Sequence, residues 1–129
     1  LKESDVVSIH APSIPETYHM INARTLALMK DDAVLINTAR GSIIDEQALA
    51  SELKKGRLSA CIDVTDPEPP AEDHPFRSLP NVVLTPHIAG AVNNGQNRIA
   101  KYVISEIQAY TDGEIMDGEV LQSRISTLA

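Results

Sequence analysis

The sequence has little of what marks secreted, membrane-spanning or nucleic-acid-binding proteins. It contains one cysteine, Cys61, so no disulfide can form within the chain, which fits a protein of the reducing cytoplasm. No apolar run approaches the length of a transmembrane helix, and no signal-peptide pattern opens the chain. Acidic residues outnumber basic ones by 18 to 11, and the net charge of −7 argues against nucleic acid or an anionic membrane as the main partner.

Several common catalytic and metal-binding motifs are missing as well. The chain has neither kind of glycine-rich phosphate loop and no nucleophile elbow. Its four histidines are scattered, and their spacing predicts no metal site. A dinucleotide cofactor remains compatible with the acidic balance, because backbone N–H groups and helix N-termini hold much of its phosphate charge.

Four short runs rich in valine and isoleucine are predicted to be strands. They lie at residues 6–9, 33–37, 59–64 and 82–85. Each run is apolar throughout instead of alternating, which is typical of strands that are covered on both faces in a parallel sheet.

Helical patterns alternate with these strands. The first helix is predicted to begin at Asn22, a good N-cap, with Ile21 and Leu26 at the two positions of a hydrophobic staple. The second is predicted over 45–55, and the third, over 93–112, carries an apolar stripe at helical spacing. The members of that stripe are Ile99, Tyr102, Val103, Ile107 and Tyr110. Alternation of strand and helix predicts an α/β fold around a parallel sheet.

Polar side chains follow all four predicted strands, at the edge where parallel sheets bind ligands. They are His10, Thr38, Arg40, Asp63, Glu68 and His87. The guanidinium of Arg40 suits a carboxylate held by two hydrogen bonds. His87 can exchange a proton near neutral pH, and a carboxylate such as Glu68 beside it would favour the protonated ring. Together these three residues predict a site for a 2-hydroxy acid, although no side chain can replace the hydride carrier that such chemistry requires.

Each of these residues also has a structural interpretation. Arg40 could pair with an acid on the following helix, His87 could cap a strand end, and Glu68 could be a solvated acid of the proline-rich loop 65–81. Asp63 and His10 could satisfy backbone groups where their strands end. The remaining charged side chains of the loop are interpreted as surface charges; they are Asp73, His74 and Arg77.

Four stretches together carry a family pattern. They are SDVVSIHAPSIPETYHMIN, AVLINTARGSIIDEQAL, LSACIDVTDPEPP and NVVLTPHIAG, and they span residues 4 to about 90. In their order and spacing they resemble the D-isomer-specific 2-hydroxyacid dehydrogenase family, which includes phosphoglycerate, glycerate and D-lactate dehydrogenases. The resemblance implies an NAD-dependent oxidoreductase that interconverts a D-2-hydroxy acid and its 2-keto acid, and it does not distinguish NAD from NADP.

The resemblance also implies roles for individual residues. Arg40 would bind the substrate carboxylate and polarise the carbonyl, Glu68 would pair with His87, and His87 would be the acid and base. Residues that would contact or line the cofactor site are His10, Pro12, Thr38, Ala39, Arg40, Asp63, His87, Ile88, Ala89 and Gly90. The implied partners are a small 2-hydroxy or 2-keto acid and a second copy of the chain in a homodimer.

The chain departs from the family pattern in what it lacks. The GxGxxG turn, the acid that binds the cofactor ribose and the substrate domain have no counterpart in it. We therefore expect the C-terminal half of a Rossmann-type parallel sheet with flanking helices, in which residues 1–112 form a partial dinucleotide-binding domain and 113–129 a tail. Because the sequence opens with Leu1 almost directly before a strand, we expect a fragment of a longer protein that is inactive alone.

Two other interpretations stay open at the level of sequence. The same fold and catalytic triad occur in corepressors that sense NAD(H) and bind peptide motifs, and the chain could also be an inactive half-domain.

The loop EDHPFRSLPN further resembles formate dehydrogenases of the same superfamily, which place glutamine where this chain has Glu68. A neutral amide suits formate, which has no hydroxyl proton to move, so Glu68 favours a hydroxy acid.

Overall fold

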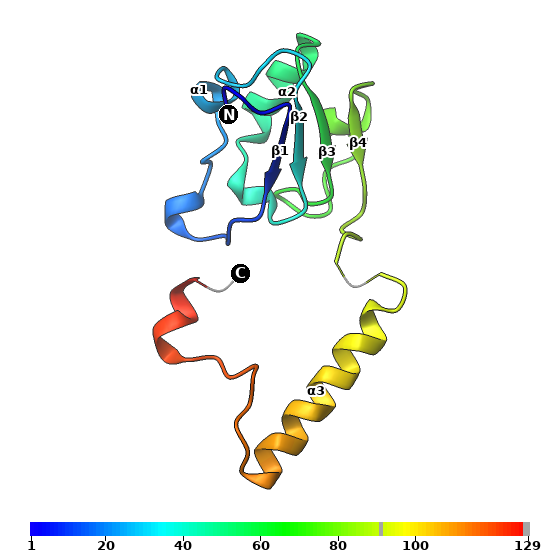
Figure 1. The fold of residues 1–129 in the computed structure, drawn as a ribbon. Helices are drawn as coiled ribbons and strands as arrows, with labels where there is room; N and C mark the ends of the chain where they lie inside the picture. The colour runs from blue at the N-terminus through cyan, green and yellow to red at the C-terminus, as the bar shows by residue number, and fades with distance from the viewer. Residues whose placement is uncertain (91, 128–129) are drawn as a thin grey trace. The chain divides into compact units, whose positions relative to one another are not determined.

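A computed structural model describes residues 1–90 and 92–127, and within it the chain forms two compact units. The first unit comprises residues 1–87, and the second begins at Ile88. Figure 1 shows the sheet in the first unit and one long helix in the second. The predicted limits of a dinucleotide-binding domain at 1–112 and a tail at 113–129 stay a prediction.

The first unit is built on a parallel sheet of four strands in the order β1-β2-β3-β4. Their bounds are Val6–Ile9 for β1, Val34–Asn37 for β2, Ser59–Ile62 for β3 and Val82–Leu84 for β4. The register places Ile9, Asn37, Ile62 and Leu84 in one row across the sheet. The predicted α/β class with a parallel sheet is confirmed, and every strand carries its following loop to the same edge.

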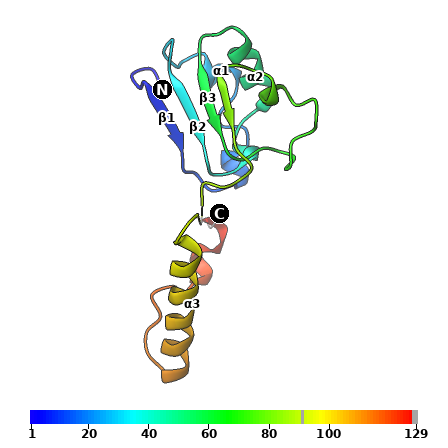
Figure 2. The ribbon, with the colours of Figure 1, turned by 90° about the vertical axis from the view of Figure 1, so that its right-hand side faces the viewer.

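Two helices cover one face of this sheet (Figure 2). Helix α1, Ala23–Leu26, begins after Asn22, whose side chain accepts hydrogen bonds from the backbone N–H groups of Arg24 and Thr25. Helix α2, Glu46–Lys54, begins after Asp45, whose carboxylate accepts from the N–H of Ala48. Both caps satisfy donors that a helix start leaves unpaired, so these two N-termini lie where the sequence predicts them.

The opposite face of the sheet is more open. Val6 and Val83 lie on it and are 56% and 60% exposed, whereas Leu35 and Ile62, which point toward the helices, are buried. Within the first unit, α1 and α2 thus cover one face of the sheet, and coverage of the strands on both faces stays a prediction.

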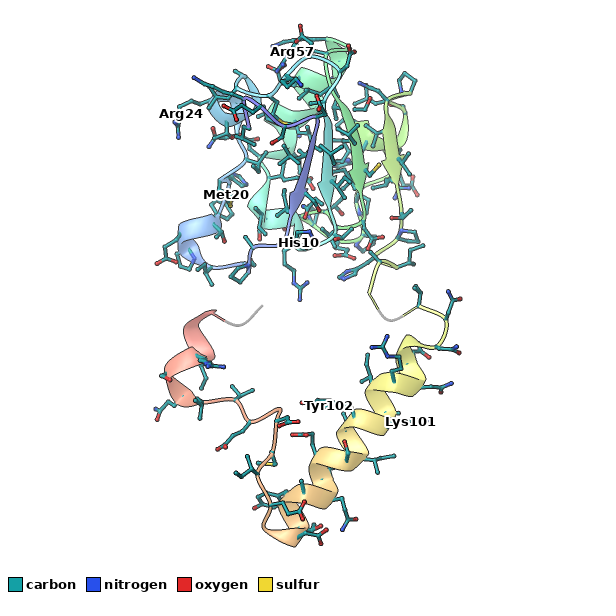
Figure 3. The ribbon with its side chains drawn as sticks, in the orientation of Figure 1. His10, Met20, Arg24, Arg57, Lys101 and Tyr102 are labelled. Carbon is teal, nitrogen blue, oxygen red and sulfur yellow. The ribbon has the colours of Figure 1, made fainter. Side chains whose placement is uncertain are left out.

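The second unit consists of α3, Gly95–Asp112, and a segment that runs back beside it. The helix ends where Gly113 adopts the left-handed conformation, with φ of 72°. Glu106 accepts a hydrogen bond from the N–H of Gly118 at 2.7 Å. Figure 3 shows Tyr102 directed toward this returning segment and Lys101 directed away from it. The helix is confirmed close to its predicted bounds, but none of the apolar stripe on it is buried.

Candidate active site

The edge formed by the carboxyl ends of the strands gathers the predicted polar residues of the first unit. His10 follows β1, Thr38 follows β2, Asp63 follows β3 and His87 lies three residues beyond β4. Figure 3 shows His10 at this end of the sheet and Arg57 at the opposite end. Parallel topology therefore brings residues far apart in sequence to one edge, where ligands bind in open α/β sheets.

Glu68 and His87 form a pair at this edge. The Nδ1 atom of His87 lies 2.7 Å from Oε1 of Glu68, and both side chains are partly exposed. The backbone N–H of His87 donates to the carbonyl of Asp63 at 2.9 Å, and His87 adopts a left-handed φ of 53°. Because a carboxylate only accepts, Nδ1 is the donor in this bond. The other ring nitrogen, Nε2, is therefore the atom that can exchange a proton with a substrate.

A cavity of about 410 Å³ opens beside this pair. Polar and charged residues in its lining are Asp63, Thr65, Glu68, Arg77, Thr85 and His87. Asp63 is 4% exposed, and its Oδ1 accepts a hydrogen bond from the Thr85 hydroxyl at 2.5 Å. The cavity thus places a buried carboxylate near an imidazole–carboxylate pair.

Arg40 lies in the turn that follows β2. The buried side chain of Asn37 shapes this turn, because its amide donates to the Arg40 carbonyl at 2.9 Å and its oxygen accepts from the Ala39 N–H at 3.1 Å. The guanidinium is exposed and donates to the Ala39 carbonyl at 2.6 Å. No ion pair links Arg40 to an acid of α2 in the described part of the chain, so the structural interpretation of this arginine finds no support.

Gly41 brings the Arg40 turn against the loop that carries Glu68. A Cβ atom at this position would lie 2.1 Å from the carbonyl carbon of Thr65 and 2.6 Å from the backbone nitrogen of Asp66. No side chain fits at such distances, so the two backbones touch only because residue 41 is glycine. Gly41 therefore allows the Arg40 turn to pack directly against the backbone of the loop that carries Glu68.

The other residues predicted to contact the cofactor differ in their hydrogen bonds and in their exposure. The Nε2 atom of His10 lies 2.9 Å from the Ser8 hydroxyl, and the carbonyl of Pro12 accepts from Thr17 at 2.6 Å. Thr38 is exposed and Ala39 is partly buried. The segment 88–90 belongs to the second unit. The structure thus gathers Asp63, Glu68 and His87 around one cavity, and the cofactor roles stay predictions.

His74 was assigned to the loop surface, and the structure corrects this. Its side chain is 9% exposed, and its Nε2 lies 3.0 Å from Oε2 of Glu46 on α2. Burial raises the pKa of Glu46 above its usual value, although its hydrogen bonds to Asp66 and His74 act in the opposite direction. Sequence reasoning missed Glu46, Asn37 and Gly41 as elements of the site. The available signal for His74 was the neighbouring Phe76, an apolar residue within an acidic loop.

Comparison with known proteins decides the family. A model of the NAD-binding domain of D-isomer specific 2-hydroxyacid dehydrogenases matches residues 1–89. The chain belongs to this family. The resemblance predicted from the four sequence stretches is therefore confirmed.

Individual relatives of this chain support the same family assignment. A glyoxylate reductase of Thermofilum pendens is 43% identical over 129 residues, an alignment that covers 96% of this chain and 38% of that protein. The crystal structure of the TT0316 protein from Thermus thermophilus has a TM-score of 0.83 at 43% identity, with 94% of this chain and 39% of that chain covered. A D-lactate dehydrogenase with NAD⁺ from Lactobacillus jensenii has a TM-score of 0.84 at 31% identity, covering 95% and 41%. This chain therefore spans about two fifths of the length of each of these relatives.

No helix among residues 1–90 and 92–127 is long and apolar enough to cross a membrane. The same residues contain no group of three or more His, Cys, Asp or Glu side chains that could hold a metal ion.

Proposed function

We propose that the protein containing this chain is an NAD(H)-dependent 2-hydroxyacid dehydrogenase that acts on a small D-2-hydroxy acid and its 2-keto acid. The observation that carries the proposal is the contact between Glu68 and His87 at the carboxyl edge of the sheet. A carboxylate that accepts from Nδ1 favours the charged imidazole and holds the ring in one orientation. A proton donor of this kind suits reduction of a carbonyl group.

The residues at the edge fit the nicotinamide end of a dinucleotide. The buried Asp63 carboxylate can accept a hydrogen bond from a carboxamide, and the cavity beside it lies where open α/β sheets hold cofactors. When bound, the nicotinamide supplies or receives the hydride. Within the first unit, His10, Pro12, Thr38 and Ala39 complete the proposed cofactor contacts.

The chain's own residues handle the proton and the charge. In reduction, Nε2 of protonated His87 gives its proton to the carbonyl oxygen while Glu68 holds Nδ1. In oxidation, the neutral ring takes the hydroxyl proton through the same atom. Arg40 binds the substrate carboxylate through two hydrogen bonds and orients the carbonyl toward His87.

The full-length gene product tests this proposal. We expect glyoxylate, pyruvate or hydroxypyruvate to be reduced at the expense of NADH or NADPH, measured by loss of nicotinamide absorbance. Both cofactors belong in the assay, because related structures were solved with NAD⁺ and with NADPH. Oxidation of formate alone would contradict a hydroxy acid substrate. Binding of NAD(H) and peptides without turnover of any keto acid would favour a corepressor-like module, and a dimer in solution would support the proposed homodimer.

Glu68→Gln should lower kcat for keto-acid reduction by about tenfold or more. Glutamine has nearly the same size but loses the carboxylate that accepts from Nδ1 of His87, so the imidazole loses the charged contact that orients it. Steady-state kinetics with saturating NADH measure the loss. Glu72→Gln, at an exposed acid of the same loop, is the matched control, and an unchanged kcat for Glu68→Gln would refute the orienting role.

A further inference from the structure

Glu46, at the first position of α2, contacts the loop that carries Glu68 through both of its carboxylate oxygens. Oε1 accepts a hydrogen bond from the backbone N–H of Asp66 at 3.0 Å. Oε2 lies 3.0 Å from Nε2 of His74. The Nδ1 atom of His74 accepts from the N–H of Phe76 at 3.3 Å, so Nε2 carries a proton and donates it to Glu46. A single side chain thereby holds the loop at two points.

Core packing and further hydrogen bonds also fix the loop near Asp66 and His74. Phe76, next to His74, is 2% exposed and lies in the hydrophobic core. Arg77 donates to the carbonyls of Pro70 and Ala71, both at 2.9 Å. The hydroxyl of Thr65 donates to the carbonyl of Pro67 at 3.0 Å. A displacement of Asp66 or His74 would consequently be transmitted to Glu68, which lies between them in the chain.

The peptide that Glu46 holds is the one against which Gly41 packs. The Thr65–Asp66 peptide therefore contacts the Arg40 turn and the start of α2 at the same time. A substrate that spans Arg40 and His87 needs a constant spacing between the Arg40 turn and the Glu68–His87 pair, because reacting groups lose rate steeply when they are misplaced.

From these contacts we propose that Glu46 is a positioning residue for the catalytic carboxylate. It fixes the Glu68 loop against the Arg40 turn and so sets the contact between Glu68 and His87. The proposal rests on the proposed function for its kinetic consequences only. A buried carboxylate costs desolvation free energy that an apolar side chain would avoid, so the pair of Glu46 and His74 specifies a geometry more than it adds stability.

The test uses Glu46→Ala and Glu46→Gln in the full-length protein. Alanine removes both contacts, whereas glutamine keeps an acceptor for Asp66 and loses the acceptor for His74. We expect kcat for keto-acid reduction to fall by about 10- to 100-fold in the alanine variant, and by less in the glutamine variant, with the affinity for NADH unchanged. Asp45→Asn, which keeps an N-cap one residue earlier, is the matched control and should alter kcat by less than about twofold.

A double-mutant cycle separates positioning from general loss of stability. If Glu46 acts through Glu68, adding Glu46→Ala to Glu68→Gln should cost less than about twofold further in kcat. If the fold-losses in kcat of the two single variants multiply in the double variant, the proposal is overturned. Should Glu46→Ala fail to fold, the cycle is run with Glu46→Gln.

A measurement that does not depend on turnover distinguishes failure of the positioning role of Glu46 from failure of the proposed dehydrogenase function. At one fixed pH, the chemical shifts of the His87 ring should change in Glu46→Ala, because the contact with Glu68 is altered, and stay in place in Asp45→Asn, as followed by NMR. Charged groups that share the cavity with His87 are Asp63, Glu68 and Arg77, and only Glu68 lies on the loop segment that Glu46 holds. A shift without turnover in the unaltered protein would support positioning and contradict the dehydrogenase function. A folded alanine variant with unchanged His87 ring resonances would overturn the positioning role.

Discussion

Replacement of Arg40 by alanine should lower kcat/KM for 2-keto acids by about 10²- to 10³-fold, the range seen when one preorganised donor is removed from an active site. The physical reason is the loss of two charge-assisted hydrogen bonds to the substrate carboxylate and of the positive charge near the carbonyl. Among the described residues, the exposed guanidinium has no ion pair to α2 that its removal would break. The loss should therefore fall on catalysis with little effect on the melting temperature.

Two variants serve as controls for Arg40→Ala. Arg40→Lys keeps the charge but loses the planar fork, so an intermediate loss of kcat/KM is expected. Arg24→Ala removes another exposed arginine, at the start of α1, and should leave the kinetics unchanged. Steady-state kinetics with a saturating cofactor measure all three. An Arg40→Ala enzyme with unaltered kcat/KM would remove Arg40 from the proposed site.

His87→Asn should lower kcat by about 10²- to 10⁴-fold, the usual contribution of a general acid or base. Asparagine is the suitable replacement because it tolerates the left-handed backbone that His87 adopts. The variant should still bind NADH, and its single-turnover rate should fall together with kcat because the group that gives the proton is gone. Fluorescence titration of NADH and single-turnover kinetics measure both effects.

The pairing of His87 with Glu68 gives a second check on this prediction. In the His87→Asn background, Glu68→Gln should change kcat by less than about twofold, because the ring on which Glu68 acts is absent. A His87→Asn variant that keeps the kcat of the unaltered protein would assign the proton transfer to another residue. Asp63, which lines the same cavity, would then be the next residue to replace.

Some parts of this fold follow from neighbouring residues alone. Asn22 caps α1, and Ile21 and Leu26 are both buried beside it, as the staple pattern predicts. The four strands are short apolar runs with loops between them, and alternation with helices was sufficient to predict a parallel sheet. These features were predictable because caps and periodicity depend on residues only a few positions apart.

Other features depend on contacts between distant segments. His74 was interpreted as a surface charge because its loop is rich in acidic residues, yet it pairs with Glu46, which lies 28 positions away. The sequence around a loop histidine does not indicate which distant element contacts it.

The sequence by itself indicated the family, the parallel arrangement and the edge at which the loops after the strands meet, since the pattern of each element and the residues after each strand are local information. Only the tertiary structure decided that Glu68 and His87 touch at 2.7 Å, that Gly41 packs on the Thr65–Asp66 peptide and that Glu46 holds the same peptide. Those contacts join segments that are brought together by burial of the core between sheet and helices, and their distances follow from packing that no local pattern encodes.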